Sequence, residues 1–126
     1  MSELSEASRL LQAAQRDLNA LAGMLDSDVF AEEIFGFHVQ QAAEKLFKAW
    51  LSALGETYPY THDLNLLLQI LTDLDCDVTT YQELTDFNIF AVQLRYDALD
   101  TDDEDIDREE AIGLLQSLFN CVEAVI

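Results

Sequence analysis

The fold is decided by residues 29–55, VFAEEIFGFHVQQAAEKLFKAWLSALG. This stretch has no proline and ends on Gly55, which suits a helix C-terminal cap, and Asp26-Ser27-Asp28 before it can supply the N-cap. At 1.5 Å per residue the predicted helix is roughly 40 Å long. Gly36 lies inside it at a cost of about 1 kcal/mol relative to alanine. We therefore expect a bend or a close crossing of another helix there.

Apolar residues recur at three- and four-residue intervals in the rest of the chain, and this spacing predicts further helices. We expect a first helix over residues 5–24, a short third helix capped by Thr61, a fourth over residues 80–96 and a last helix after a charged loop at residues 97–105. The prediction is an all-α fold, an antiparallel four- to five-helix up-down bundle forming one domain over residues 1–126. Ile34, Leu54 and Ile89 are expected to face its core.

The composition is strongly acidic. The chain has 25 Asp and Glu against six Lys and Arg, a formal net charge of −19, and half of its residues are hydrophobic. A chain this apolar can fold, but its average surface repels the phosphates of nucleic acids. Two cysteines without CxxC spacing indicate reduced thiols. We find no leader and no apolar run of the ~18–20 residues that span a bilayer, so we expect a cytoplasmic protein without membrane attachment.

A polar stripe runs along the long second helix. At 100° per residue, His38, Gln41, Lys45 and Lys48 fall within an arc of about 80°, with Glu44 at its margin. Lysines one turn apart repel each other, so something should offset them. One interpretation is a solvated face on which Glu44 pairs with Lys48. The other is a cationic groove for a phosphate or for the carboxylates of a partner.

Three segments carry a resemblance to a known family. In order, they are FHVQQAAEKLFKAWL at 37–51, THDL at 61–64 and LRY at 94–96. Together they resemble the HEPN family of small helical domains, which are commonly encoded beside a minimal nucleotidyltransferase, and the likeness extends over about residues 5–125. The resemblance implies a helical bundle that usually forms a homodimer. It also implies a groove lined by Gln41, Lys45 and Lys48, often with Arg95 near the dimer contact.

The resemblance implies two functional classes. Many HEPN proteins are metal-independent ribonucleases that carry an Arg followed four to six residues later by a His. The His would move a proton at the ribose 2′-hydroxyl while the Arg stabilises the phosphorane. Here no histidine follows Arg95; the only two are His38 and His62, and nine carboxylates lie between Asp97 and Glu110. This departure argues against the ribonuclease class.

We therefore expect a non-catalytic HEPN module that dimerises, binds a nucleotidyltransferase partner and is a candidate to hold a nucleotide or phosphate at Lys45 and Lys48. The alternative is a ribonuclease toxin of a HEPN/nucleotidyltransferase toxin–antitoxin pair, with a degenerate site of Arg95 and His62 or His38, and only this reading requires RNA. A plain acidic interaction protein that mimics nucleic acid is a third class, supported by charge but by no motif.

The remaining candidates have more than one interpretation. His62 can bond a neighbouring segment and fix the loop, or reach the groove beside the lysines. Arg95 with Tyr96 can cap the fourth helix, cross the dimer interface or complete the groove. The tentative ligand-binding set is Gln41, Lys45, Lys48, His62, Arg95 and Tyr96. No metal or cofactor is expected, since H-E-x-x-H is absent and the acidic run at 100–107 lacks the glycine of a calcium loop.

Overall fold

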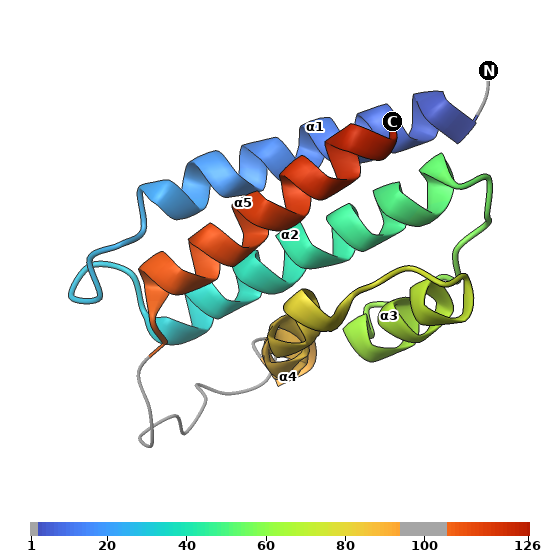
Figure 1. Ribbon diagram of the computed structural model, residues 1–126. Helices are drawn as coiled ribbons and strands as arrows, with labels where there is room; N and C mark the ends of the chain where they lie inside the picture. The colour runs from blue at the N-terminus through green and yellow to red at the C-terminus, as the bar shows by residue number, and fades with distance from the viewer. Residues whose placement is uncertain (1–2, 94–105) are drawn as a thin grey trace.

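The computed structural model describes residues 3–93 and 106–126, and within these ranges the chain contains helices and no strand (Figure 1). The all-α prediction is confirmed. The elements in chain order are α1 (Glu3–Ala22), α2 (Glu32–Ala53), α3 (Leu64–Asp73), the 3-10 helix η1 (Thr79–Phe87), α4 (Asn88–Gln93) and α5 (Arg108–Val125).

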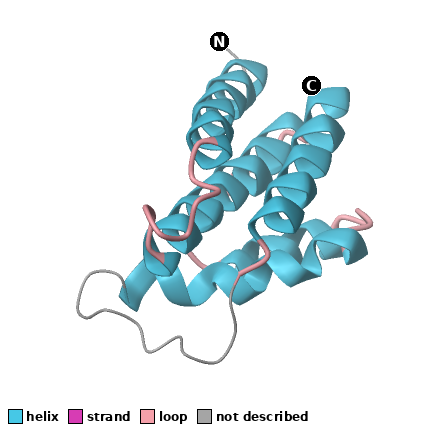
Figure 2. Cartoon of the chain, turned by 90° about the vertical axis from the view of Figure 1, so that its left-hand side faces the viewer, coloured by secondary structure: helices cyan, strands magenta, loops and turns pink. Residues whose placement is uncertain are grey.

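The three long helices α1, α2 and α5 pack side by side, with α1 antiparallel to α2 and α5 running in the same direction as α2 (Figure 1). The short elements α3, η1 and α4 cover another side of α2 (Figures 1 and 2). The start of α1 and the end of α5 lie at the same end of the bundle. Helix α2 is therefore the central helix, because every other element packs against it.

Helix α2 buries a broad apolar side against several helices. Its fully buried apolar residues are Phe35, Val39, Ala42, Ala43, Leu46, Phe47, Ala49 and Leu51. The prediction was wrong for Ile34, Leu54 and Ile89, which are 38%, 42% and 46% exposed. Each lies in the first turn or at the cap of its helix, where the neighbouring elements no longer cover it.

The C-terminus of α2 confirms the role predicted for Gly55. The glycine has φ 81°, a left-handed conformation that suits a residue without Cβ. Its amide donates to the carbonyl of Ser52 at 3.0 Å, and the amide of Glu56 donates to that of Leu51 at 3.0 Å. This is the Schellman arrangement, and it satisfies carbonyls that the helix end leaves free.

Two predicted helix starts were wrong. Helix α2 begins at Glu32 rather than after Asp26-Ser27-Asp28, because Asp26 Oδ1 accepts the amide of Asp28 at 2.9 Å within a turn of its own. Helix α3 is capped by Asp63, not Thr61, since Asp63 accepts the amide of Asn65 at 2.9 Å. Helix α5 starts with acidic residues, which its dipole favours there: Asp107 caps it and Glu109 and Glu110 occupy its first turn.

The predicted fourth helix is divided. Its first half is the 3-10 helix η1, where the hydroxyl of Thr85 donates to the carbonyl of Gln82, a contact that competes with α-helical bonding. Only α4 is α-helical, and residues 94–96 lie outside the described ranges. Helix α4 crosses α2 at Gly36, where a Cβ would stand 2.6 Å from the Phe90 ring. The close crossing expected at Gly36 is therefore confirmed.

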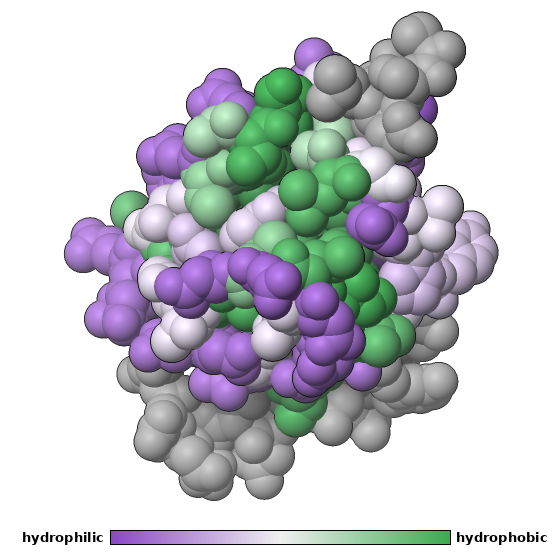
Figure 3. All heavy atoms as spheres, turned by 45° about the vertical axis from the view of Figure 1, so that its right-hand side comes forward, coloured by the Kyte–Doolittle hydropathy of each residue, from purple (hydrophilic) through white to green (hydrophobic). Residues whose placement is uncertain are grey.

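Apolar side chains also reach the surface at the end of the bundle where α2 and α5 finish. Leu54, Val125 and Ile126 are 42%, 43% and 37% exposed. Figure 3 views the molecule from this side and shows apolar residues gathered among polar ones.

Candidate functional site

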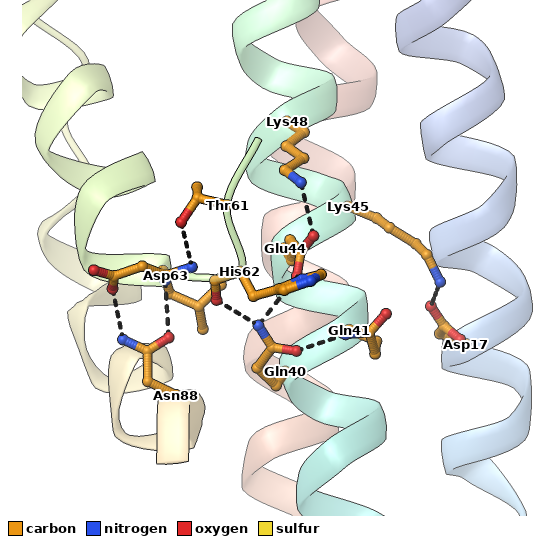
Figure 4. Close-up of polar contacts among 11 residues, drawn as sticks. Asp17, Gln40, Gln41, Glu44, Lys45, Lys48, Thr61, His62, Asp63 and Asn88 are labelled. Carbon is orange, nitrogen blue, oxygen red and sulfur yellow. Dashed lines mark hydrogen bonds and ion pairs between the residues drawn. The ribbon is translucent and has the colours of Figure 1, made fainter. Parts of the chain in front are cut away.

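The polar residues of α2 form a network with the segment that joins α2 to α3 (Figure 4). We call Gln40, Gln41, Glu44, Lys48 and His62 the Glu44 cluster, because the carboxylate of Glu44 is its centre. Lys48 Nζ donates to Glu44 Oε2 at 2.7 Å, and Gln40 Nε2 donates to Oε1 at 3.2 Å. His62 Nδ1 lies 2.9 Å from the same Oε1. One carboxylate thus binds three side chains.

Gln40 ties the cluster together and was missed at the level of sequence. Its side chain is fully buried, its Nε2 also donates to the main-chain carbonyl of His62 at 2.8 Å, and its Oε1 accepts from Gln41 at 2.8 Å. A signal was available, because Gln40, Glu44 and Lys48 are spaced four residues apart and so lie on one line of the helix.

The Glu44–Lys48 pair forms as the solvated-face interpretation predicted, but it is buried. The side chains of Lys48 and Glu44 are 10% and 9% exposed. Burial opposes ionisation of Glu44, yet the hydrogen bonds from Lys48 and His62 outweigh it and hold its pKa below the ordinary value. Lys48 Nζ also lies 5.4 Å from the centroid of the Tyr58 ring, a cation–π contact.

Lys45 belongs to a separate pair. Its Nζ donates to Asp17 Oδ2 of α1 at 2.7 Å, with side-chain exposures of 30% and 16%. The two like charges on the stripe are therefore offset, as expected, by one carboxylate each. Neither lysine is a free cation facing solvent.

The other predicted site residues are not brought into the cluster by any described contact. The ring of His38 meets that of Phe37 edge to face at 5.5 Å, and its buried Nδ1 has no hydrogen-bond partner in the part of the chain that the structure describes. Arg95 and Tyr96 lie outside the described residues, so their roles stay predictions.

Tyr58 anchors the same segment to α1. Its hydroxyl donates to Glu6, whose other oxygen accepts from Arg9 at 2.6 Å. Burial and the hydrogen bond to Glu6 raise the pKa of Tyr58 to about 12. The bond from Tyr58, with a smaller contribution from Arg9, lowers the pKa of Glu6.

Arg108 is a second polar residue that the sequence did not single out. It is 6% exposed, and its guanidinium donates to the carbonyls of Met24 and Phe30, each at 2.7 Å. It also stands over the Phe35 ring at 4.8 Å. Arg108 therefore holds the loop between α1 and α2 against α5. Beside it lies a cavity of about 320 Å³ with the carboxylates of Glu32, Asp107 and Glu109 in its lining, a poor environment for an anion.

Over residues 3–93 and 106–126, no three His, Cys, Asp or Glu side chains gather as metal ligands would. None of the described helices has the length and apolarity needed to cross a membrane.

Comparison with known families decides the relationship. The model of the HEPN domain matches residues 7–125. The chain belongs to the HEPN family. No curated protein and no solved structure matches it. The HEPN match runs from α1 to the end of α5, so it includes all of the Glu44 cluster.

Proposed function

We propose that this HEPN domain is a non-catalytic binding module that forms a homodimer and pairs with a nucleotidyltransferase protein. The observation that carries the proposal is the use of Lys45 and Lys48 within the fold. Each lysine donates to a carboxylate at 2.7 Å, so both hold parts of the fold together. The stripe therefore offers no free positive charge to a phosphate, which favours a protein as the ligand of the domain. The nucleotidyltransferase comes from the family resemblance.

A nucleotide or phosphate is the less favoured occupant of the stripe. To bind both lysines it would have to displace Asp17 and Glu44, and Glu44 would then be left buried beside an anion. Among the described residues, the displaced carboxylate of Glu44 would keep His62 and Gln40 as its partners. We therefore assign the partner protein, rather than a phosphate, as the principal ligand.

Ribonuclease activity is disfavoured by sequence and charge. The acid–base histidine is missing after Arg95, and a net charge of −19 repels an RNA backbone. The imidazole of His62 contacts Glu44, which in turn binds Lys48. Lys45 and Lys48 are both paired with carboxylates, so neither offers a free positive charge to stabilise a phosphorane.

The exposed apolar residues Leu54, Val125 and Ile126 support the homodimer. They lie at the end where α2 and α5 finish and offer apolar area to a second copy.

Co-purification tests the function. The chain is expressed with a minimal nucleotidyltransferase from the same organism, and only one of the two proteins carries an affinity tag. We expect both to elute together, with no cleavage of added tRNA or mRNA and no melting shift with nucleotides. Elution of the tagged protein alone, or RNA cleavage that an Arg95→Ala variant loses, would refute the proposal.

A further inference from the structure

The segment between α2 and α3, residues 54–63, is an irregular connector that side chains of other elements hold in place. Near its middle, Tyr58 donates to Glu6 of α1. Near its end, His62 is held twice: its carbonyl accepts from Gln40 at 2.8 Å and its ring contacts Glu44 at 2.9 Å. These anchors come from two different helices, so the connector is fixed relative to the bundle.

The last residues of the connector are fixed by a third element. Asn88, at the start of α4, donates from Nδ2 to Asp63 Oδ1 at 2.9 Å, and its Oδ1 accepts the amide of Leu64 at 2.8 Å. The hydroxyl of Thr61 accepts the amide of Asp63 at 3.0 Å. Figure 4 shows these contacts beside the Glu44 cluster. A connector whose backbone is held on both sides of Tyr60 loses little backbone entropy when it binds.

Tyr60 stands between the anchors and is fully exposed. Its relative exposure is 106%, whereas Tyr81 is 7% exposed and Tyr58 is partly buried. The side chain of His62, two residues later, is 70% exposed although its Nδ1 is engaged. Tyrosine is enriched among the residues that dominate binding energy at protein interfaces, because its ring offers apolar area and polar contact together.

We propose that Tyr60 and the exposed edge of His62 form a docking surface for a cationic protein surface, with an arginine or lysine of the partner seated on the Tyr60 ring. The identity of the natural partner as a nucleotidyltransferase rests on the proposed function; the cationic chemistry does not. A cation is attracted to the face of an aromatic ring, and arginine also stacks on it.

Charge selects this occupant. The connector contains Glu56 and Asp63 but no Lys or Arg, and the whole chain carries −19. Phosphates are repelled from the connector, whereas a basic surface is attracted and steered toward it.

The experiment measures affinity in two arms by biolayer interferometry. In the first arm the probe is a hexa-arginine peptide, and the wild type is compared with Tyr60→Ala, Tyr60→Phe and the distant control Val29→Ala, a residue that is 68% exposed. We expect Tyr60→Ala to weaken binding by about two- to fivefold, the range of an exposed cation–π contact, while Tyr60→Phe and Val29→Ala leave it unchanged. Thermal midpoints equal to that of the wild type establish that the variants fold.

In the second arm the probe is a minimal nucleotidyltransferase from the same organism, the class of partner that the proposed function names. Tyr60→Ala should weaken this complex at least tenfold, as an interface hot spot does. If the wild type binds the nucleotidyltransferase and Tyr60→Ala binds equally well, the docking surface is refuted and the proposed function stands. If the wild type does not bind it, the proposed function fails, and the peptide arm alone decides the docking surface. Equal peptide affinities for wild type and Tyr60→Ala, or a Tyr60-dependent affinity for a poly(U) oligonucleotide instead, overturn the inference.

Discussion

Replacing Glu44 with Gln should destabilise the fold far more than the matching change at Asp17. Both carboxylates accept from a lysine of α2 at 2.7 Å, but Glu44 is more deeply buried and also contacts Gln40 and His62. Glu44→Gln leaves Lys48, only 10% exposed, without its charged partner. Breaking a buried pair from one side costs about 3 kcal/mol of the free energy of unfolding. The side chain of Lys45 is already 30% exposed, so water can solvate it when Asp17→Asn removes its partner. This variant should cost about 1 kcal/mol or less of the free energy of unfolding.

Urea denaturation followed by circular dichroism at neutral pH measures both variants. A double variant, Glu44→Gln with Lys48→Met, removes the unpaired charge and should recover most of the loss. Equal costs for Glu44→Gln and Asp17→Asn, or a double variant no more stable than Glu44→Gln, would refute the buried network.

The same variant has a defined pH dependence. The pKa of Glu44 is lowered in the folded protein from an ordinary value of 4.5, so its ionised form stabilises the fold. The difference in unfolding free energy between wild type and Glu44→Gln should be fully present above pH 4.5. It should shrink as the pH falls through the lowered pKa of the folded state. A difference that stays constant into acid contradicts this assignment.

Three further changes test other parts of the structure. Gly36→Ala should lower the free energy of unfolding by about 1–3 kcal/mol, although alanine has the better helix propensity, because its Cβ would stand 2.6 Å from the Phe90 ring. Adding Phe90→Leu should relieve the clash. A Gly36→Ala variant more stable than the wild type would contradict the close crossing. Spectrophotometric titration should reveal one phenol with a pKa of about 12, and Tyr58→Phe should remove that titration step. The bond from Tyr58 to Glu6 stabilises the fold fully below pH 10, and this stabilisation is lost as the pH rises through about 12. A titration without a step near pH 12 would show that the bond is absent. Raising the salt concentration from about 0.1 to 1 M shortens the Debye length from about 10 to 3 Å. Because the chain has a net charge of −19, this screening should raise the melting temperature measured by calorimetry. An unchanged or lower melting temperature would show that charge repulsion does not destabilise the fold.

Local sequence signals predicted most of the fold. The long apolar stripe without proline and the terminal glycine placed α2 and its end at Gly55, because helix periodicity and a left-handed cap depend only on neighbouring residues. The start of α2 was missed because Asp26 can cap either a helix or a turn of its own, and the turn forms. The loop that contains this turn is also held by Arg108, which binds the carbonyl of Met24 from 84 residues away.

The candidate site was predicted in outline only. The periodicity located Lys45 and Lys48 on one polar stripe, but it could not say that Asp17, from another helix, would pair with Lys45. Gln40 is fully buried, and its burial is tolerated because the carbonyl of His62, 22 residues later, accepts its amide. Both contacts depend on how helices and connector pack in space, which a single-sequence pattern does not contain.

Sedimentation velocity of the chain, alone and mixed with a minimal nucleotidyltransferase from the same organism, tests the proposal that this HEPN domain acts by binding a protein. We expect a dimer for the chain alone and a faster species, containing both proteins, when the nucleotidyltransferase is added. A monomer whose sedimentation coefficient does not change on that addition would contradict the proposal.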